Sequence, residues 1–209
     1  MNWQWVRDHI PDFADKLGLH TYLSVMPVLY GLLIAIPLGV ACARWPRLYP
    51  PVTGLTSTLY ALPSVALFML LLDVTGLSNA TVIIPLTVYS LAVLVPNVVD
   101  GLRSVPEPVR QSAAAMGFGP VRRLVQVELP VAVPVVMAGL RIATVSNISV
   151  VSVGALVGIG GLGQLFTDGL QRDFMTPIVC GIVLTVLLAI AFDGLLVLGL
   201  RFLTPWARP

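Results

Sequence analysis

The placement of charge constrains this chain more than any other feature of its sequence. Only 11% of its 209 residues are charged, against about 25% in typical soluble domains. Five long stretches contain no charge at all: 17–43, 48–72, 74–99, 142–167 and 174–192. With 57% hydrophobic residues, the chain has more apolar surface than a fold in water can bury. The sequence therefore argues against a soluble globular protein, and it excludes a disordered one.

Each charge-free stretch is about long enough for a helix to cross a lipid bilayer. A bilayer core is about 30 Å thick, and a helix rises about 1.5 Å per residue, so roughly 20 apolar residues span it. Helices are favoured because lipid offers no partners for backbone N–H and C=O groups, and the stretches lack the alternation of barrel strands. The sequence predicts an all-α polytopic membrane protein. Its five transmembrane helices are expected near 20–43, 54–73, 80–99, 132–157 and 177–200.

The basic residues predict the orientation, because cytoplasmic loops carry an excess of Lys and Arg. Eight arginines follow the first, third and fifth spans: Arg44, Arg47, Arg103, Arg110, Arg122, Arg123, Arg201 and Arg208. The other side carries three basic residues, Arg7, Lys16 and Arg172. We therefore expect the N-terminus outside the cell and the C-terminus inside.

The chain is expected to have three parts. Residues 1–18 place apolar side chains on one helical stripe, which predicts an amphipathic segment lying on the outer membrane surface. Residues 19–203 form the transmembrane domain, and residues 204–209 form a cytoplasmic tail. The first apolar run is too long for a cleavable signal peptide, so none is expected.

Residues 100–131 form the one sizeable polar segment, a loop predicted on the cytoplasmic face. Ser104 and Glu107 are spaced as a capping box for a first short helix, and Gly117 suits its left-handed end. Pro120 is expected to open a second helix, and Pro130 to close it. These local features do not decide between an ordinary connecting loop and a surface on which another protein docks.

The spacing in this loop resembles the EAA loop of type I ABC importer permeases. That loop reads Glu-Ala-Ala, three residues, Gly, nine residues, Ile, one residue, Leu-Pro. The matching positions here are Gln111, Ser112, Ala113, Gly117, Val127, Leu129 and Pro130. Gln111 replaces the usual Glu and Ser112 the first Ala, so a charged contact made by that Glu would be absent. The segments HTYLSV (20–25), IPLGV (36–40), TSTLYALPSVALFMLLL (56–72) and VGIGGLGQLFTDGL (157–170) are similar to permeases of osmoprotectant importers.

This resemblance, which covers about residues 19–203, implies the type I ABC importer (MetI-like) permease fold in a bacterial cytoplasmic membrane. It implies a subunit without catalytic chemistry that imports glycine betaine, choline or carnitine, or another small solute such as an amino acid. The implied partners are two ABC ATPase subunits docked on the loop, a second permease subunit, identical or homologous, and an external substrate-binding protein. ATP and magnesium would be bound by the ATPase subunits, with no cofactor in this chain and no nucleic acid partner.

No nucleotide or metal site is expected in the chain itself. A P-loop needs a lysine before Ser or Thr, and the only lysine, Lys16, precedes Leu17. Residues 158–163 spell G-x-G-x-x-G but follow a span-length apolar run instead of a strand, so a flexible or tightly packed turn is expected there. The histidines and cysteines form no cluster that would bind a metal. His20 is expected to be a polar residue at a membrane boundary.

Two charges, Arg141 and Asp193, are predicted at or near membrane depth, where charged groups usually face a cavity, a partner or an interface. Asp193 as an ion-coupling carboxylate would make the chain a self-sufficient secondary carrier or channel. Pairing or snorkelling would make both charges structural. The aromatic residues best placed to line a translocation path are Tyr60, Phe68 and Tyr89. Aromatic faces attract quaternary ammonium groups through cation–π interactions.

Overall fold

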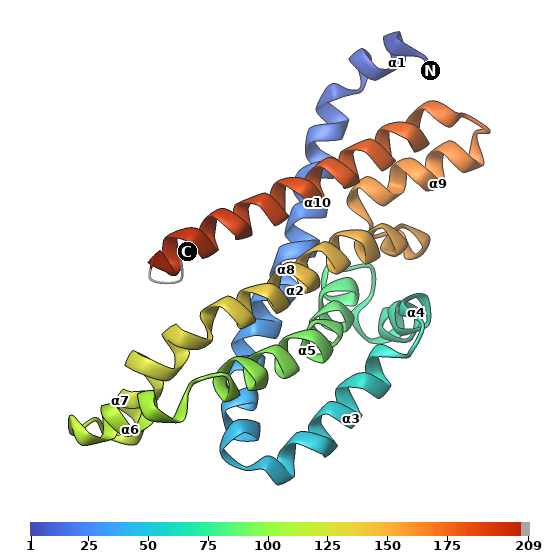
Figure 1. Ribbon diagram of the computed structural model, residues 1–209. Helices are drawn as coiled ribbons and strands as arrows, with labels where there is room; N and C mark the ends of the chain where they lie inside the picture. Colours follow the sequence, from blue (N-terminus) through green and yellow to red (C-terminus); the bar gives the residue numbers. More distant parts are fainter. Residues whose placement is uncertain (206–209) are drawn as a thin grey trace.

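The computed structural model describes residues 1–205, and it contains no β-strand among them. The chain is a series of helices joined by short turns (Figure 1). The α-helices are α1 (Trp3–Asp8), α2 (Ile10–Arg44), α3 (Tyr49–Tyr60), α4 (Ser64–Thr75), α5 (Ala80–Arg103), α6 (Glu107–Ala115), α7 (Pro120–Arg123), α8 (Leu129–Val151), α9 (Gln164–Gln171) and α10 (Met175–Leu203). Short 3-10 turns lie at η1 (Pro46–Leu48), η3 (Ser152–Val157) and η4 (Gly161–Gly163), and η2 (Leu124–Glu128) is a π-helix. The predicted all-α class is confirmed.

Within residues 1–205, four helical segments are long and apolar enough to cross a membrane: α2, α5, α10 and the run Pro120–Val157 that contains α8. They coincide with the first, third, fifth and fourth predicted spans. The second predicted span, 54–73, was wrong as a single helix, because α3 and α4 meet at an angle of 89°. Pro63 explains the break, since proline disfavours helical backbone at the residue before it and lacks the N–H that a helix interior needs.

The N-terminal segment also differs from the expectation. Helix α2 begins at Ile10 and continues without interruption through residue 18 into the first span. Pro11 lies in the first turn of α2, where its missing N–H costs nothing. Only α1 is separate, so residues 1–18 do not form one independent amphipathic segment.

The predicted end of the second loop helix at Pro130 was wrong. The chain is helical from Pro120 onward, and Pro130 lies in the first turn of α8. The π-helix η2 comes immediately before it, and the Leu129 N–H donates to the Leu124 carbonyl, five residues back. This wider turn accommodates Pro130, which cannot donate a backbone hydrogen bond. The helix therefore continues from the loop into α8.

Helices α2, α5 and α8 form the centre of the molecule and approach one another at glycines. A Cβ at Gly39 of α2 would lie 2.5 Å from Val98 of α5, and one at Gly139 of α8 would lie 2.6 Å from Asn97. Small residues allow helix backbones to pack closely in a membrane, where dispersion contacts drive association. Helix α10 packs on α8 from outside, and α3 and α4 lie on the other side of α5 (Figure 1).

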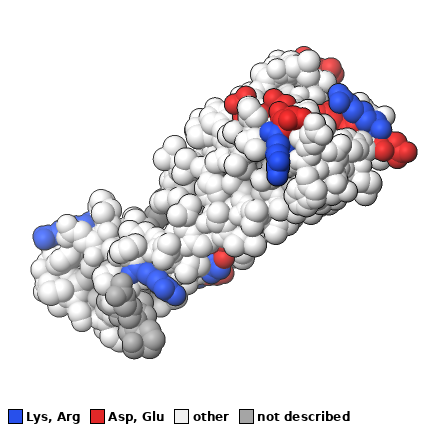
Figure 2. Space-filling model, turned by 90° about the horizontal axis from the view of Figure 1, so that it is seen from above, with Lys and Arg blue, Asp and Glu red and all other residues white. Residues whose placement is uncertain are grey.

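Charged side chains gather at the two ends of the elongated molecule, with an almost uncharged surface between them (Figure 2). Asp12, Asp15 and Asp168 line a pocket at one end, where α1, α2 and α9 meet. Arg44, Arg110 and Arg123 line a pocket at the other end, near α6 and α7. A broad apolar belt between two charged ends is the pattern of a protein that crosses a bilayer.

Candidate functional site

Helix α6 carries the loop residues that sequence spacing singled out. It begins after Pro106 and does not use the predicted capping box, because the Ser104 hydroxyl donates to the Gly101 carbonyl at 2.8 Å instead. Its end matches the prediction. Gly117 has φ of +80°, and the Gly117 and Phe118 N–H groups donate to the carbonyls of Ala114 and Ala113. This pattern is a Schellman motif, which requires a left-handed residue and so favours glycine.

Most of α6 is exposed, and Ala113 is its buried residue. Ala113 is 1% exposed, whereas Gln111 and Ser112 lie on the surface. The Gln111 side chain donates to the Glu107 carboxylate at 3.4 Å, and the Ser112 hydroxyl donates to the Pro108 carbonyl at 2.8 Å. No side chain from another element covers these polar groups within the described residues. Helix α6 therefore presents a short, largely uncovered face.

The remaining positions of the loop pattern lie behind this face. Leu129 packs against the core of α2, α5 and α8, and Pro130 follows it in the first turn of α8. Helix α6 contacts both α7 and η2. The structure thus brings the two halves of the loop pattern together. Residues 111–117 lie on the exposed helix α6 and at its end, and residues 127–130 lie where the loop joins α8.

Arg122 and Arg123 of the loop both bind side chains of the same chain. The Arg122 guanidinium donates to Gln126 at 2.9 Å and lies over the Phe118 ring, 4.4 Å from its centroid. Arg123 forms an ion pair with Glu128, with Nε and Oε1 2.8 Å apart.

The three aromatic residues predicted to line a path have different environments. Phe68 is completely buried in the core of this chain, so its assignment to an open path was wrong. Tyr89 is 6% exposed, and its hydroxyl donates to the Leu62 carbonyl at 2.6 Å. That carbonyl lies at the break between α3 and α4, where the helical hydrogen bonds stop. Tyr60 is 47% exposed and packs edge-on against Tyr89, with ring centroids 5.4 Å apart.

The two charges predicted at membrane depth bind each other. Arg141 of α8 donates to Asp193 of α10 through Nε at 2.7 Å and through Nη2 at 2.8 Å. Both side chains remain more than one third exposed on the surface of this chain, beside Ala138, Ile142 and Ser146. The pairing leaves no free carboxylate at Asp193. It agrees with the structural alternative for both residues.

His20 holds a position that sequence reasoning missed. It is completely buried, and it connects α2 to two distant segments. Its Nδ1 accepts from the Leu162 N–H at 3.2 Å, so its Nε2 carries the hydrogen and donates to the Ile148 carbonyl at 2.9 Å. Gly161, with φ of +47°, lies against it, and a Cβ there would be 2.7 Å from the His20 Cβ. The glycine-rich turn is thus tightly packed, one of the two forms expected.

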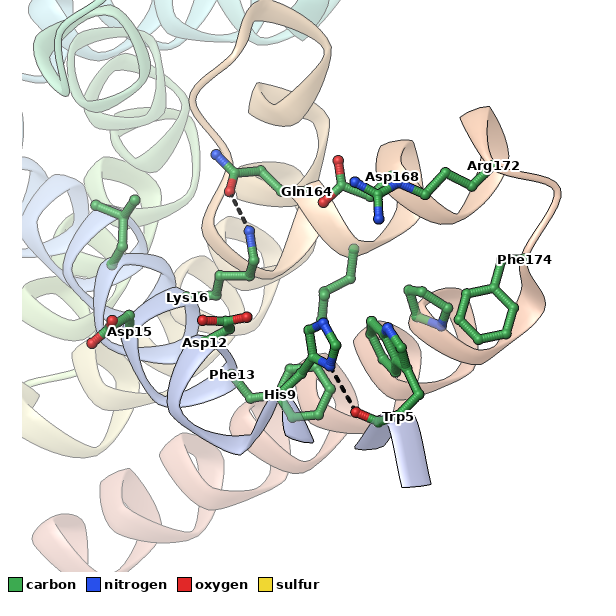
Figure 3. Close-up of a pocket in the computed structure, with 13 residues that line it drawn as sticks. Trp5, His9, Asp12, Phe13, Asp15, Lys16, Gln164, Asp168, Arg172 and Phe174 are labelled. Carbon is green, nitrogen blue, oxygen red and sulfur yellow. Dashed lines mark hydrogen bonds between the residues drawn. The ribbon is translucent and has the colours of Figure 1, made fainter. Parts of the chain in front are cut away.

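A pocket of 470 Å³ opens at the acidic end of the molecule (Figure 3). Trp5 and Phe13 line it from one side, and Phe174 packs edge-on against Trp5 with ring centroids 5.5 Å apart. Lys16 donates to Gln164 across it at 2.6 Å. The pocket brings residues 5–19 together with residues 164–177, so no local pattern signalled it. Within the described residues, no group of three or more His, Cys, Asp or Glu side chains is placed to hold a metal ion.

Comparison with known proteins gives consistent matches over most of the chain. Residues 35–201 match the family model of binding-protein-dependent transport system inner membrane components. The choline transport system permease protein OpuBD of Bacillus subtilis is 34% identical over 91% of this chain and 85% of its own length. The glycine betaine/carnitine/choline transport system permease protein OpuCD of the same organism is 38% identical, covering 86% and 78%. The osmoprotectant import permease protein OsmW of Salmonella typhimurium is 34% identical, covering 92% of each chain.

The fold has matches among solved structures. An inward-facing structure of the MetNI methionine ABC transporter aligns with a TM-score of 0.84 and 21% identity, covering 94% of this chain and 98% of that one. An amino acid ABC transporter with histidines aligns with a TM-score of 0.77 and 15% identity, covering 96% and 98%. At these identities the likeness concerns the fold.

Proposed function

Because the chain belongs to the family of binding-protein-dependent transport system inner membrane components, we propose that it is the permease subunit of an ATP-driven importer for a quaternary-amine osmoprotectant such as glycine betaine, choline or carnitine. The observation that carries this proposal is the exposed helix α6, held by Ala113 and Gly117 at the positions of the family's coupling loop. Such permeases are not themselves enzymes. ATP and magnesium would be bound by separate ATPase subunits.

The proposed assembly contains two ATPase subunits, a second permease subunit and an external binding protein. The ATPases would dock on α6 at the arginine-rich end, which is the cytoplasmic end by the excess of basic residues. The binding protein would deliver substrate at the acidic end, the end shown in Figure 3. This orientation places the N-terminus outside and the C-terminus inside.

Movement of α6 would reach the membrane through two rigid connections. Helix α6 follows α5 after a short turn at residues 104–106, and it contacts the continuous helical run Pro120–Val157. Helices α5 and α8 pack closely at Gly101 and Gly139, where an added Cβ would lie 3.0 Å or less from the facing helix. Closure of the ATPases would draw the two coupling helices together, and α5 and α8 would move with them to open the path outward.

Tyr60 is the predicted path residue whose ring is accessible in this chain. An exposed aromatic face at a helix break suits a quaternary ammonium group, which binds aromatic rings through cation–π attraction. Carbonyls freed at a break are tolerated in a membrane only where they are buried in protein or face a water-filled cavity. We place Tyr60 at the surface where the two permease subunits enclose the path.

The test is reconstitution of the chain in proteoliposomes with its ATPase and binding protein. Uptake of labelled glycine betaine, choline and carnitine should require ATP and both partners, and labelled methionine should not be taken up. A protonophore should leave uptake unchanged. Uptake by the chain alone that a protonophore abolishes, and that Asp193→Asn removes, would show a secondary carrier instead. Methionine uptake in place of the three amines would overturn the substrate class.

A further inference from the structure

A basic pocket of 280 Å³ lies where the end of α2 meets α5, α6 and α7. It is formed by Arg44 of α2, Arg110 of α6 and Arg123 of α7, with one carboxylate, Glu128. The other lining residues are apolar: Val40, Ala43, Leu102, Pro120, Val121 and Leu124. Three arginines thus border a small pocket whose other walls are apolar apart from Glu128.

The single carboxylate does not balance this charge. Glu128 binds Arg123, with Oε1 and Nε 2.8 Å apart. Within residues 1–205, neither Arg44 nor Arg110 forms an ion pair. The pocket therefore carries two positive charges without a matching anion.

Arg110 is the pocket residue that has an unsatisfied donor. Its Nη2 donates to the Leu102 carbonyl, which fixes the guanidinium against the end of α5. Its Nε is buried and donates to no group of the described chain. A buried donor without an acceptor destabilises a fold, and a bound ion is one of the explanations for such an atom.

We propose that this pocket binds a phosphate group, carried by an anionic lipid headgroup or by free phosphate. A guanidinium presents donors in a planar fork that matches phosphate oxygens, and hydrogen bonds between two charged groups are the strong ones. The position fits both sources. Helix α2 ends at Arg44, and the adjacent Trp45 is 61% exposed, as indoles at the headgroup level are. Because Arg110 belongs to α6, the bound phosphate would tie the coupling helix to the end of α2.

The test measures binding to the permease itself, so it is independent of the transport function proposed above. The full chain is placed in lipid nanodiscs of phosphatidylcholine, with or without phosphatidylglycerol. A third sample has phosphatidylcholine alone with inorganic phosphate, compared with chloride at equal ionic strength. Native mass spectrometry measures retained phosphatidylglycerol, and hydrogen–deuterium exchange measures protection of the α6 amides. The variants are Arg110→Gln and Arg44→Gln, and Arg47→Gln is the control, because Arg47 is exposed nearby but does not line the pocket.

Wild type and Arg47→Gln should retain phosphatidylglycerol and gain protection of α6, whereas the two pocket variants should bind roughly tenfold more weakly. Protection by the lipid alone identifies a headgroup, and protection by inorganic phosphate alone identifies the free anion. Arg110→Gln loses the hydrogen bond to the Leu102 carbonyl and could unfold for that reason. Arg44→Gln makes no such change, so it tests the pocket independently. Equal binding by wild type and both pocket variants would overturn the proposal. An equal loss in Arg47→Gln would overturn it as well.

Discussion

Arg141 and Asp193 join α8 to α10 through a bidentate ion pair, with N–O distances of 2.7 and 2.8 Å, on a surface where both remain more than one third exposed. In a membrane, such a surface must face a second subunit or water, because a charge facing lipid is costly. The pair therefore marks a side of the chain that lipid does not cover, and it attaches the otherwise lightly packed α10.

Asp193→Asn or Arg141→Met should each lower stability, because each leaves the other charge unpaired in a helix that crosses the membrane. An unpaired charge is costly in lipid. Thermal unfolding in nanodiscs measures the loss, and the double variant Arg141→Met with Asp193→Asn should recover most of it. Asp73→Asn, which removes an exposed carboxylate at the end of α4, should have no effect. Additive losses in the double variant would show that the two side chains do not stabilise each other.

Gly161→Ala should destabilise the chain strongly, because the new Cβ would lie 2.7 Å from the His20 Cβ at a backbone φ of +47°. Positive φ alone costs an L-residue about 1–2 kcal/mol. The clash would also displace His20 from the hydrogen bond that it accepts from the Leu162 N–H. Gly18→Ala is the matched control. It adds the same methyl group within α2, with no atom within 4 Å, and should be neutral or slightly stabilising. Equal melting temperatures for the two variants would contradict this account of the turn.

The sequence was sufficient for the features that depend on local pattern. Charge-free stretches located the membrane helices, because the cost of charge in lipid acts at every position of a span. The left-handed end of α6 at Gly117 followed from its residue type. The break at Pro63 had a visible signal, but the length of the apolar run 48–72 masked it, since hydropathy does not distinguish one helix from two.

Contacts between distant residues were not accessible in this way. His20 binds Ile148 and Leu162, which lie 128 and 142 residues away. A polar residue near a span end has the same local pattern whether it faces headgroups or a buried carbonyl. Arg141 and Asp193 were recognised as costly charges, but only the packing of α8 on α10 shows that they satisfy each other. Phe68 was misassigned for the same reason, because apolar periodicity does not distinguish the core of one subunit from a path between two.

Tyr89→Phe should lower stability by about 1 kcal/mol, because it removes the hydrogen bond to the Leu62 carbonyl and leaves that carbonyl without its donor at the bend. The ring and its contact with Tyr60 would remain. Tyr30→Phe is the control, since Tyr30 is 43% exposed and its hydroxyl makes no hydrogen bond within the described chain. The measurement is thermal unfolding of both variants in the same lipid. An unchanged melting temperature for Tyr89→Phe would show that the bend does not need this bond.

Gly117→Val should abolish ATP-driven uptake while leaving the protein folded in the membrane. Gly117 has φ of +80°, a conformation that a β-branched residue strongly disfavours, so α6 could not end where it does. Open space surrounds the position, since no atom lies within 4 Å of an added Cβ, and the change therefore creates no clash in the core. Gly117→Asn is the matched control, because asparagine tolerates left-handed backbone, and it should keep most of the uptake. Uptake in proteoliposomes and ATPase binding are measured for both variants. Normal uptake by Gly117→Val would show that α6 has no coupling role. Lost uptake in both variants would show that coupling requires the absence of a side chain at position 117, and not only its left-handed backbone.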